Sequence, residues 1–277
     1  MGVRVSQDGI PPAVRRVYGP EDLSTAAPFA GGYINFGDWS EIGPAGPPTR
    51  SDRVRSQQAL YRRVLGEFPR PGASRLAEVG CGRGLGCALA VQELGFTAVT
   101  GVDIHPEQVA RATAANAGPL AAHPDRLSYT TGAADRLPFE AGALDGVYSV
   151  EAAQHFPELP GFAREAARVL RPGGRLVVTT FFTSGPAAAG PLRALLESFA
   201  DGLDVPHPIT GFAEALEAAG FARPVVQSIG AAVWPGFDRF LAGGVVPPGH
   251  WSRNFLPAWR EGLLDYYLVT ADRPGTP

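Results

Sequence analysis

Residues 78–86 read EVGCGRGLG, a segment with four glycines in nine positions and an acid at its start. The residues before the first glycine, LAEV (76–79), are typical of a short buried strand, and the residues after the loop favour a helix over 85–94. A glycine-rich loop between a strand and a helix lies where open α/β sheets bind ligands, at the carboxyl ends of their strands. The segment therefore predicts an α/β fold with a ligand-binding loop.

The same alternation of strand and helix continues beyond this loop. Because the β-branched strand segments are too apolar to face water, they favour a parallel sheet that helices cover on both faces, a doubly wound Rossmann-like sheet. The strand candidates are LAEV (76–79), TAVTGVD (97–103), LSYTT (127–131), LDGVYSV (144–150), RLVVTTFF (175–182), RPVVQSI (223–229) and LLDYYLVTA (263–271). Further helices are expected from Ser51, from His105-Pro106, and over 160–170, 191–202 and 211–219.

The spacing of the glycines excludes some ligands. A dinucleotide-binding loop reads G-x-G-x-x-G, whereas this segment reads G-x-G-x-G and has Leu85 where the other pattern requires glycine. A nucleoside triphosphate loop needs a lysine followed by Ser or Thr, and the segment has neither. Asp103 lies about 20 residues beyond the loop, the separation at which an acid reaches the hydroxyl groups of a ribose. Together these features predict an adenosine-like ligand without phosphates.

Four motifs follow one another in order: E-x-G-x-G-x-G from Glu78, G-V-D-I from Gly101, L-P-F from Leu137 and V-L-R-P-G-G from Val169. With this order and spacing, the segment from about residue 74 to 182 resembles the class I S-adenosylmethionine-dependent methyltransferases. The resemblance implies a seven-stranded, mostly parallel, Rossmann-like sheet, S-adenosyl-L-methionine as cofactor and S-adenosyl-L-homocysteine as product. The alternative, that the glycines only form a tight turn and Asp103 caps the next helix, leaves the joint spacing unexplained.

The resemblance also implies cofactor-binding roles by position. The loop would pass close to the methionine part of the cofactor, because absent side chains let the backbone approach. Glu78 would steady the loop near the ammonium group, and Asp103 would bind the ribose. Ala133 stands where the family often has an acid for the adenine amino group, so Ala134 or Asp135 would substitute, with a surface turn as the alternative for Asp135. The whole predicted cofactor set is Tyr18, Tyr33, Glu78, Gly80, Cys81, Gly82, Asp103, Ile104 (on the adenine face), Ala134, Asp135 and Glu151.

The sequence EAAQHFP (151–157) follows the fourth predicted strand and is similar to a subgroup of natural-product and sugar O-methyltransferases. In that subgroup one or two histidines occupy this loop; His155 matches the second, and Gln154 replaces the first. Histidine titrates near neutrality, so His155 is a candidate catalytic base, with a structural histidine as the alternative. Thr180 stands where the subgroup carries an Asp and cannot act as a base. Catalysis by proximity, or a nitrogen acceptor, therefore stays open.

Residues 1–50 are rich in Gly and Pro but contain aromatic residues, which disordered tails rarely have. We expect an N-terminal arm over this range that acts as a lid over the active site, and a methyltransferase domain over 51–277. Plain packing of the arm is the alternative. Insertions at about 183–220 and 230–262 are expected to form helical lid segments and an apolar, aromatic acceptor pocket. The predicted substrate-binding set is Trp39, Gln154, His155, Thr180, Trp234 and Trp251.

Composition limits the partners. Hydrophobic residues make up 45% of the 277 residues, charged residues 18%, and the formal net charge is -3, so neither nucleic acid nor a membrane surface is indicated. Without an apolar run of about 20 residues or a secretory signal, we expect a cytoplasmic protein. Cys81 and Cys87 lack the paired spacing of a zinc site, so no metal is expected and both are interpreted as packing residues.

The sequence thus predicts an enzyme that transfers a methyl group from S-adenosylmethionine to oxygen or nitrogen of a small secondary metabolite, as in antibiotic tailoring. The reaction would be an in-line displacement. The acceptor is expected to be aromatic or polycyclic, and assembly as a homodimer stays open. The alternative is a cyclase, or another S-adenosylmethionine-binding protein on the same fold, that transfers no methyl group. A nicotinamide-dependent dehydrogenase is disfavoured by the glycine spacing.

Overall fold

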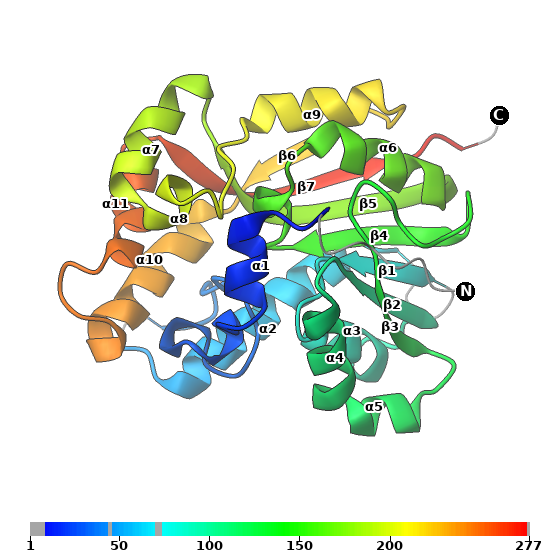
Figure 1. Cartoon of the computed structure of the whole chain (residues 1–277), viewed down its shortest axis with the longest axis horizontal. Helices are drawn as coiled ribbons and strands as arrows, with labels where there is room; N and C mark the ends of the chain where they lie inside the picture. The colour runs from blue at the N-terminus through cyan, green and yellow to red at the C-terminus, as the bar shows by residue number, and fades with distance from the viewer. Residues whose placement is uncertain (1–8, 44–45, 70–73, 276–277) are drawn as a thin grey trace.

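Among the residues that the computed structural model describes (9–43, 46–69 and 74–275), seven strands form one mixed sheet in the order β3-β2-β1-β4-β5-β7-β6 (Figure 1). The strands are β1 (Arg75–Val79), β2 (Ala98–Asp103), β3 (Leu127–Thr131), β4 (Leu144–Val150), β5 (Leu170–Thr183), β6 (Val225–Ser228) and β7 (Leu264–Asp272). Neighbours from β3 to β5 are parallel, whereas β7 is antiparallel to β5 and β6. The predicted fold class, a mostly parallel doubly wound sheet, is confirmed.

Helices cover both faces of this sheet. They are α1 (Pro12–Tyr18), α2 (Arg50–Gly66), α3 (Leu85–Gln92), α4 (Pro106–Ala115), α5 (Ala117–Ala122), α6 (Leu159–Val169), α7 (Ala189–Leu195), α8 (Glu197–Ala200), α9 (Ile209–Ala218), α10 (Gly230–Phe240) and α11 (Phe255–Arg260). Because side chains alternate along a strand, Leu76 belongs to one core cluster and Ala77 to another. The first cluster contains residues of α2, α3, α10 and α11, and the second contains residues of α6 and α9.

Several predicted boundaries differ in the structure. β5 begins at Leu170, which pairs with Leu144, so the helix expected over 160–170 ends at Val169. The helix expected over 191–202 is divided into α7 and α8, because Leu196 has extended backbone angles (φ −122°, ψ 116°). The strand expected over 223–229 is shortened to β6, an edge strand whose residues are exposed.

The N-terminal arm lies beside the carboxyl ends of the central strands. It contains α1, short 3-10 turns at Leu23–Thr25 and Ala27–Phe29, and a segment that leads to α2 (Figure 1). α2 begins with a capping box, in which Thr49 N donates to Asp52 Oδ2 (2.8 Å) and Asp52 N donates to Thr49 Oγ1 (3.1 Å). Phe36 and Trp39 of the arm are buried, so the arm packs on the sheet domain.

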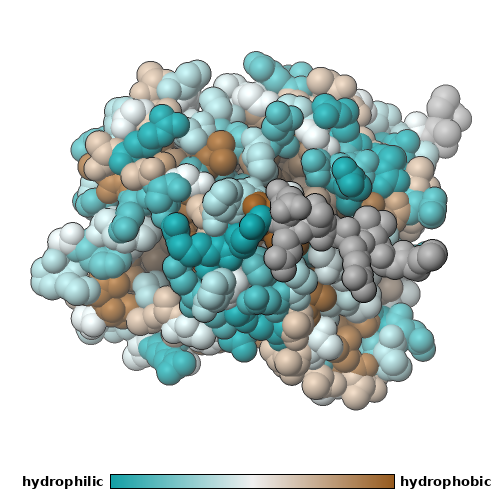
Figure 2. Space-filling model, in the orientation of Figure 1, coloured by the Kyte–Doolittle hydropathy of each residue, from teal (hydrophilic) through white to brown (hydrophobic). Residues whose placement is uncertain are grey.

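The surface carries few large apolar side chains. Figure 2 shows a mostly hydrophilic face with hydrophobic residues in small, separate patches, as is normal for a globular protein. Among the described residues, Val225 and Val226 of the edge strand β6 are the exposed large hydrophobic residues. None of the described helices is both long and apolar enough to cross a membrane.

Candidate active site

The glycine loop connects β1 to α3 and is fastened to the end of β2. Gly80 N and Cys81 N both donate to Val102 O, at 2.8 and 3.1 Å. Gly82 N donates to the carboxylate of Asp103, with 2.9 Å between N and Oδ2. The loop is therefore held by the strand that supplies the predicted ribose-binding acid.

The last glycine of the loop is needed where it stands. Gly84 precedes α3 with φ 67°, a conformation that side chains with a Cβ rarely adopt. A Cβ at Gly84 would lie 2.2 Å from the ring of Tyr129, whose hydroxyl donates to Gly84 O at 2.7 Å. The G-x-G-x-G spacing thus serves the packing of the loop on β3 as well as any ligand.

Asp103 ends β2 with a buried carboxylate. Besides the bond from Gly82, its Oδ1 accepts a hydrogen bond from His105 N at 2.9 Å. Burial raises the pKa of Asp103, and the two backbone hydrogen bonds oppose this effect. The cap of α4 is His105, whose Nδ1 accepts from Glu107 N (3.2 Å), so the capping role that the sequence left open for Asp103 belongs to another residue.

A cavity of about 810 Å³ lies between the glycine loop, the ends of β2 and β4, and the arm. Its wall brings together most of the predicted cofactor-binding residues and the predicted base. These are Tyr18, Tyr33, Gly80, Cys81, Gly82, Asp103, Ile104, Ala134, Asp135, Glu151 and His155. The wall also contains residues that the sequence did not single out, among them Ile34, Tyr61 and Thr131. Glu78, Trp39, Gln154, Thr180, Trp234 and Trp251 lie outside it.

Glu78 lies beneath the glycine loop instead of on the cavity wall. Its carboxylate is fully buried and accepts hydrogen bonds from Tyr61 Oη (2.8 Å), Tyr148 Oη (3.1 Å) and Cys87 Sγ (2.9 Å). Burial raises the pKa of Glu78 to about 7, and the three hydrogen bonds oppose this effect. Glu78 therefore joins α2, α3 and β4 beneath the loop, and its side chain lies outside the cavity wall, whereas the sequence placed it near the ammonium group of the cofactor.

His155 lies on the cavity wall in a short 3-10 turn, Ala153–His155, after β4. Its Nε2 is 2.8 Å from Tyr18 Oη of the arm and 3.1 Å from Gln154 Nε2. Its Nδ1 is 2.9 Å from Leu203 O and 3.1 Å from Asp204 Oδ1, both in the segment after α8. Three parts of the chain that are far apart in the sequence thus meet at this imidazole.

Gln154 and Thr180 lie behind His155, buried away from the cavity. Thr180 Oγ1 donates to Gln154 Oε1, and Gln154 Nε2 also donates to Glu151 O at 3.1 Å. Both side chains therefore hold the turn in place, which differs from the expected contact with substrate.

Glu151 directly follows β4 and has a strained backbone conformation, with φ 48°. Its Oε2 accepts a hydrogen bond from Phe36 N of the arm. Burial raises the pKa of Glu151, whereas the bond from Phe36 and the charge of Arg53 lower it. Arg53 is fully buried in α2, donates to Pro28 O (2.8 Å) and to Asn35 O, and so fixes the arm next to Glu151.

The tryptophans expected around the acceptor pack in the core. Trp234 is 1% exposed and stacks on Phe255, with ring centroids 5.2 Å apart and an angle of 5° between the planes. Trp39 donates from Nε1 to Phe36 O (2.9 Å) and packs on Gly236, where a Cβ would come within 2.2 Å of its ring. Trp251 is half-buried beside Phe255 (6.3 Å). These rings fill the space between one another, where the sequence suggested an aromatic acceptor pocket.

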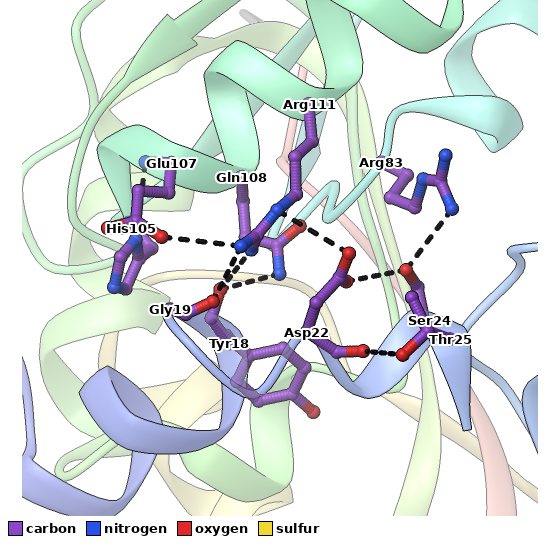
Figure 3. Close-up of polar contacts among 10 residues, drawn as sticks. All are labelled: Tyr18, Gly19, Asp22, Ser24, Thr25, Arg83, His105, Glu107, Gln108 and Arg111. Carbon is purple, nitrogen blue, oxygen red and sulfur yellow. Dashed lines mark hydrogen bonds and ion pairs between the residues drawn. The ribbon is translucent and has the colours of Figure 1, made fainter.

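The arm is fastened to α4 by a group of polar contacts that Figure 3 shows. Arg111 donates to Tyr18 O (2.7 Å) and Gly19 O (2.6 Å), and its Nε lies 3.5 Å from Asp22 Oδ2. Gln108 Nε2 donates to the same Tyr18 O at 2.8 Å. We call this group the arm clasp. No local motif marks it, because its members are about 90 residues apart.

The glycine loop takes part in the same arrangement. Arg83 Nη1 lies 3.2 Å from Ser24 Oγ, and Ser24 Oγ donates to Asp22 Oδ1 at 2.6 Å (Figure 3). The arm clasp and the loop thus hold one turn of the arm from two sides.

Known proteins share this sequence pattern. A family described as methyltransferase domain matches residues 77–178. The chain is 31% identical over 251 residues to 2-methyl-6-phytyl-1,4-hydroquinone methyltransferase of Synechocystis sp., and the match covers 82% of this chain and 74% of the relative. The chain belongs to the S-adenosylmethionine-dependent methyltransferases. The cofactor implied by the sequence resemblance is the cofactor of this family.

Other known proteins match a smaller part of the chain or share its fold. Nocamycin O-methyltransferase of Saccharothrix syringae is 36% identical over 180 residues, which cover 56% of this chain and 61% of the relative. Geranyl diphosphate methyltransferase in complex with SAM superposes with a TM-score of 0.70 at 22% identity, covering 87% of this chain and 96% of that structure. The [4+2]-cyclase SpnF has a TM-score of 0.66 at 23% identity, with 88% of both chains covered. The methyltransferase fold therefore also occurs in a cyclase.

The raised pKa of Glu78 predicts a pH-dependent stability. Because the folded state binds this proton more tightly than the unfolded state, the contribution is complete below about pH 4.5 and is lost as the pH rises to about 7. The difference between the two pKa values corresponds to roughly 3 kcal/mol. Glu78→Gln cannot ionise, so its free energy of unfolding relative to the wild type should rise by up to this amount between pH 4.5 and 8.

Urea denaturation of both proteins across this pH range measures the difference, and Glu93→Gln at an exposed site serves as the control. Effects of Asp103 and Glu151 cancel, since both proteins contain them. A wild-type-to-variant difference that stays constant with pH would show that folding does not raise the pKa of Glu78.

Proposed function

We propose that the chain transfers a methyl group to a hydroxyl oxygen of a small aromatic or polycyclic secondary metabolite, with His155 as the catalytic base. The observation that carries this proposal is the hydrogen bonding of the His155 ring. Leu203 O can only accept, so the proton of the neutral ring is assigned to Nδ1. Nε2 then accepts from Tyr18 Oη and Gln154 Nε2, and it is a basic nitrogen at the cavity wall.

The wall of the cavity fits S-adenosylmethionine. A Cβ at Gly82 would meet only Ile34 Cδ1, at 3.7 Å, so the loop backbone is open to a ligand at this point. The loop would hold the amino acid part of the cofactor, Asp103 the ribose hydroxyls, and Ile104 with Ala134 the adenine. When bound, the cofactor supplies a methyl group that is bonded to a positively charged sulfur. The leaving group of the transfer is then a neutral thioether.

The residues of this chain would contribute position and a proton acceptor. Placing the acceptor oxygen about 3 to 3.5 Å from the methyl carbon and in line with its bond to sulfur can account for about 7 to 11 kcal/mol of the barrier. A hydroxyl is a poor nucleophile until its proton leaves, and His155 Nε2 would take that proton, which contributes about 10² to 10⁴ in rate. Tyr18 Oη, 2.8 Å from Nε2, marks a position from which an acceptor hydroxyl reaches the base.

The size of the cavity supports a small acceptor. About 810 Å³ lies toward the upper end of the range of roughly 300 to 1,000 Å³ for ligand pockets, so the cavity has room for the cofactor and part of an acceptor. The curated relatives include enzymes whose names specify a hydroquinone and nocamycin as acceptors. Phenols and hydroquinones are therefore the first acceptors to test.

We further propose that the arm is a lid. Tyr18, Tyr33 and Ile34 form one wall of the cavity, so a ligand can enter or leave on this side only when the arm moves. Closure of the arm would exclude water from the cavity. The arm clasp would set the lifetime of the closed state.

Methyl transfer is tested with a labelled methyl group on the cofactor and a panel of phenols, hydroquinones and amines. We expect label on oxygen in a phenolic product, and His155→Ala should slow single-turnover transfer by about 10² to 10⁴. His123→Gln, in the loop before β3, is the matched control. Label on nitrogen, or an unchanged rate in His155→Ala, contradicts the proposed base. Conversion of an acceptor without formation of S-adenosylhomocysteine would favour the alternative hypothesis of a cyclase.

Asp103 is tested by cofactor binding alone. Asp103→Asn keeps the shape of the side chain but removes the charge, which is worth roughly 1.5 to 3 kcal/mol for a hydrogen bond to a charged group. Calorimetry should therefore show binding of S-adenosylhomocysteine that is about 10- to 100-fold weaker than in the wild type. Asp125→Asn, at an exposed turn, should bind like the wild type. If Asp103→Asn binds S-adenosylhomocysteine as tightly as the wild type does, the proposed contact between Asp103 and the ribose is wrong.

The arm clasp is tested by Arg111→Leu, which removes the contacts to Tyr18, Gly19 and Asp22. Since each charge-assisted bond is worth about 1.5 to 3 kcal/mol, bound S-adenosylhomocysteine should dissociate at least tenfold faster, as followed by stopped-flow displacement. Arg62→Leu breaks an exposed ion pair with Glu93 and should leave this rate unchanged. If Arg111→Leu does not change the dissociation rate, the arm clasp does not control ligand release.

A further inference from the structure

Asp204 carries a buried carboxylate next to the predicted base. It follows α8, is 4% exposed, and its backbone N donates to Ser198 O at 2.8 Å. The next residue, Val205, donates from N to Gln154 O at 2.8 Å, and the preceding residue, Leu203, accepts from His155 Nδ1. Three consecutive residues of this segment therefore contact the 154–155 turn. This geometry fixes the distance of 3.1 Å between Asp204 Oδ1 and His155 Nδ1.

The buried Asp204 carboxylate has an oxygen whose hydrogen bonding is not satisfied by the described residues. Oδ1 is buried and accepts no hydrogen bond within the described part of the chain, because the Nδ1 proton is directed at Leu203 O. A buried carboxylate oxygen without a partner is unfavourable. The other ionisable groups that act on this site are Tyr18 from α1, Asp103 at the end of β2 and Glu151 at the end of β4, and none of them supplies a positive charge. The imidazole of His155 is the group in contact that can become a cation.

We infer that Asp204 is a positioning residue for the methyl transfer, which orients His155 and stabilises its protonated form while the base holds the acceptor proton. The inference rests on the proposed function.

The step balances in atoms and charge. The acceptor O–H bond breaks and its proton bonds to His155 Nε2, while an oxygen lone pair forms the bond to the methyl carbon. The carbon–sulfur bond breaks with its electron pair going to sulfur. The positive charge thus moves from sulfur to the imidazole ring, where Asp204 is 3.1 Å away. The ring returns its proton to water when the arm opens.

The inference is tested on the protein with bound S-adenosylhomocysteine, without any acceptor. ¹⁵N NMR of the imidazole ring reports both the position of the proton and the midpoint of the ring titration. An opposite charge at this distance shifts such a midpoint by about 1 to 3 pH units, so Asp204→Asn should move the midpoint of His155 to lower pH by about one unit or more. Glu197→Gln removes a charge from an exposed site on α8, just before this segment, and should leave the midpoint unchanged. A midpoint that is the same in Asp204→Asn and the wild type overturns the inference.

Kinetics separate positioning from structure. With an acceptor that accepts the labelled methyl group, Asp204→Asn should lower kcat about 10- to 100-fold with little change in KM for the cofactor, and Asp204→Glu should restore part of kcat. Equal losses in Asp204→Asn and Asp204→Glu, with an unchanged NMR midpoint, would leave a packing role only. If Asp204→Asn does not fold, Asp204→Ser replaces it in both measurements. Because the NMR readout needs no turnover, its failure leaves the proposed function intact, and a lack of methyl transfer does not decide the NMR result.

Discussion

The carboxylate of Asp103 is the constraint on which the rest of the site depends. It accepts one hydrogen bond from the glycine loop and one from the residue that caps α4, so a single side chain joins β1, β2 and α4 at their common edge. α4 in turn carries Gln108 and Arg111, which hold the backbone of Tyr18. The phenol of Tyr18 reaches His155. The predicted cofactor acid and the proposed base are thus connected through one short helix and one residue of the arm.

The elements near the glycine loop could be predicted from sequence because their signals are local. Strand β1, the loop and the start of α3 follow from apolar periodicity and from glycines with positive φ, and Asp103 follows from a fixed separation. The expected cofactor residues Gly80, Cys81 and Gly82 do lie on the cavity wall. Glu78 shows the limit of this reasoning, since proximity to the loop in sequence did not reveal that its side chain points beneath the loop.

The contacts around His155 and Tyr18 could not be predicted, because they join segments that are distant in sequence. Asp204 meets His155 across 49 positions, and Arg111 meets Tyr18 across 93. An apolar pattern also cannot distinguish the wall of a pocket from a filled core, since both require the same residue types. Trp234 and Trp39 therefore pointed to a pocket in the sequence and proved to be core residues in the structure.

The charges around the cavity explain why a cationic ligand suits this site. Burial raises the pKa of Asp103, Glu151 and Glu78, which means that ionising each carboxylate costs free energy in the folded protein, and the charge of Arg53 offsets part of this cost for Glu151. A ligand with an ammonium and a sulfonium group would offset this cost, and its binding would favour the ionised carboxylates. After methyl transfer the sulfur is neutral, so the same acids attract the product less strongly than the substrate. The electrostatic field that favours binding of the methyl donor therefore favours the product less, which assists its release.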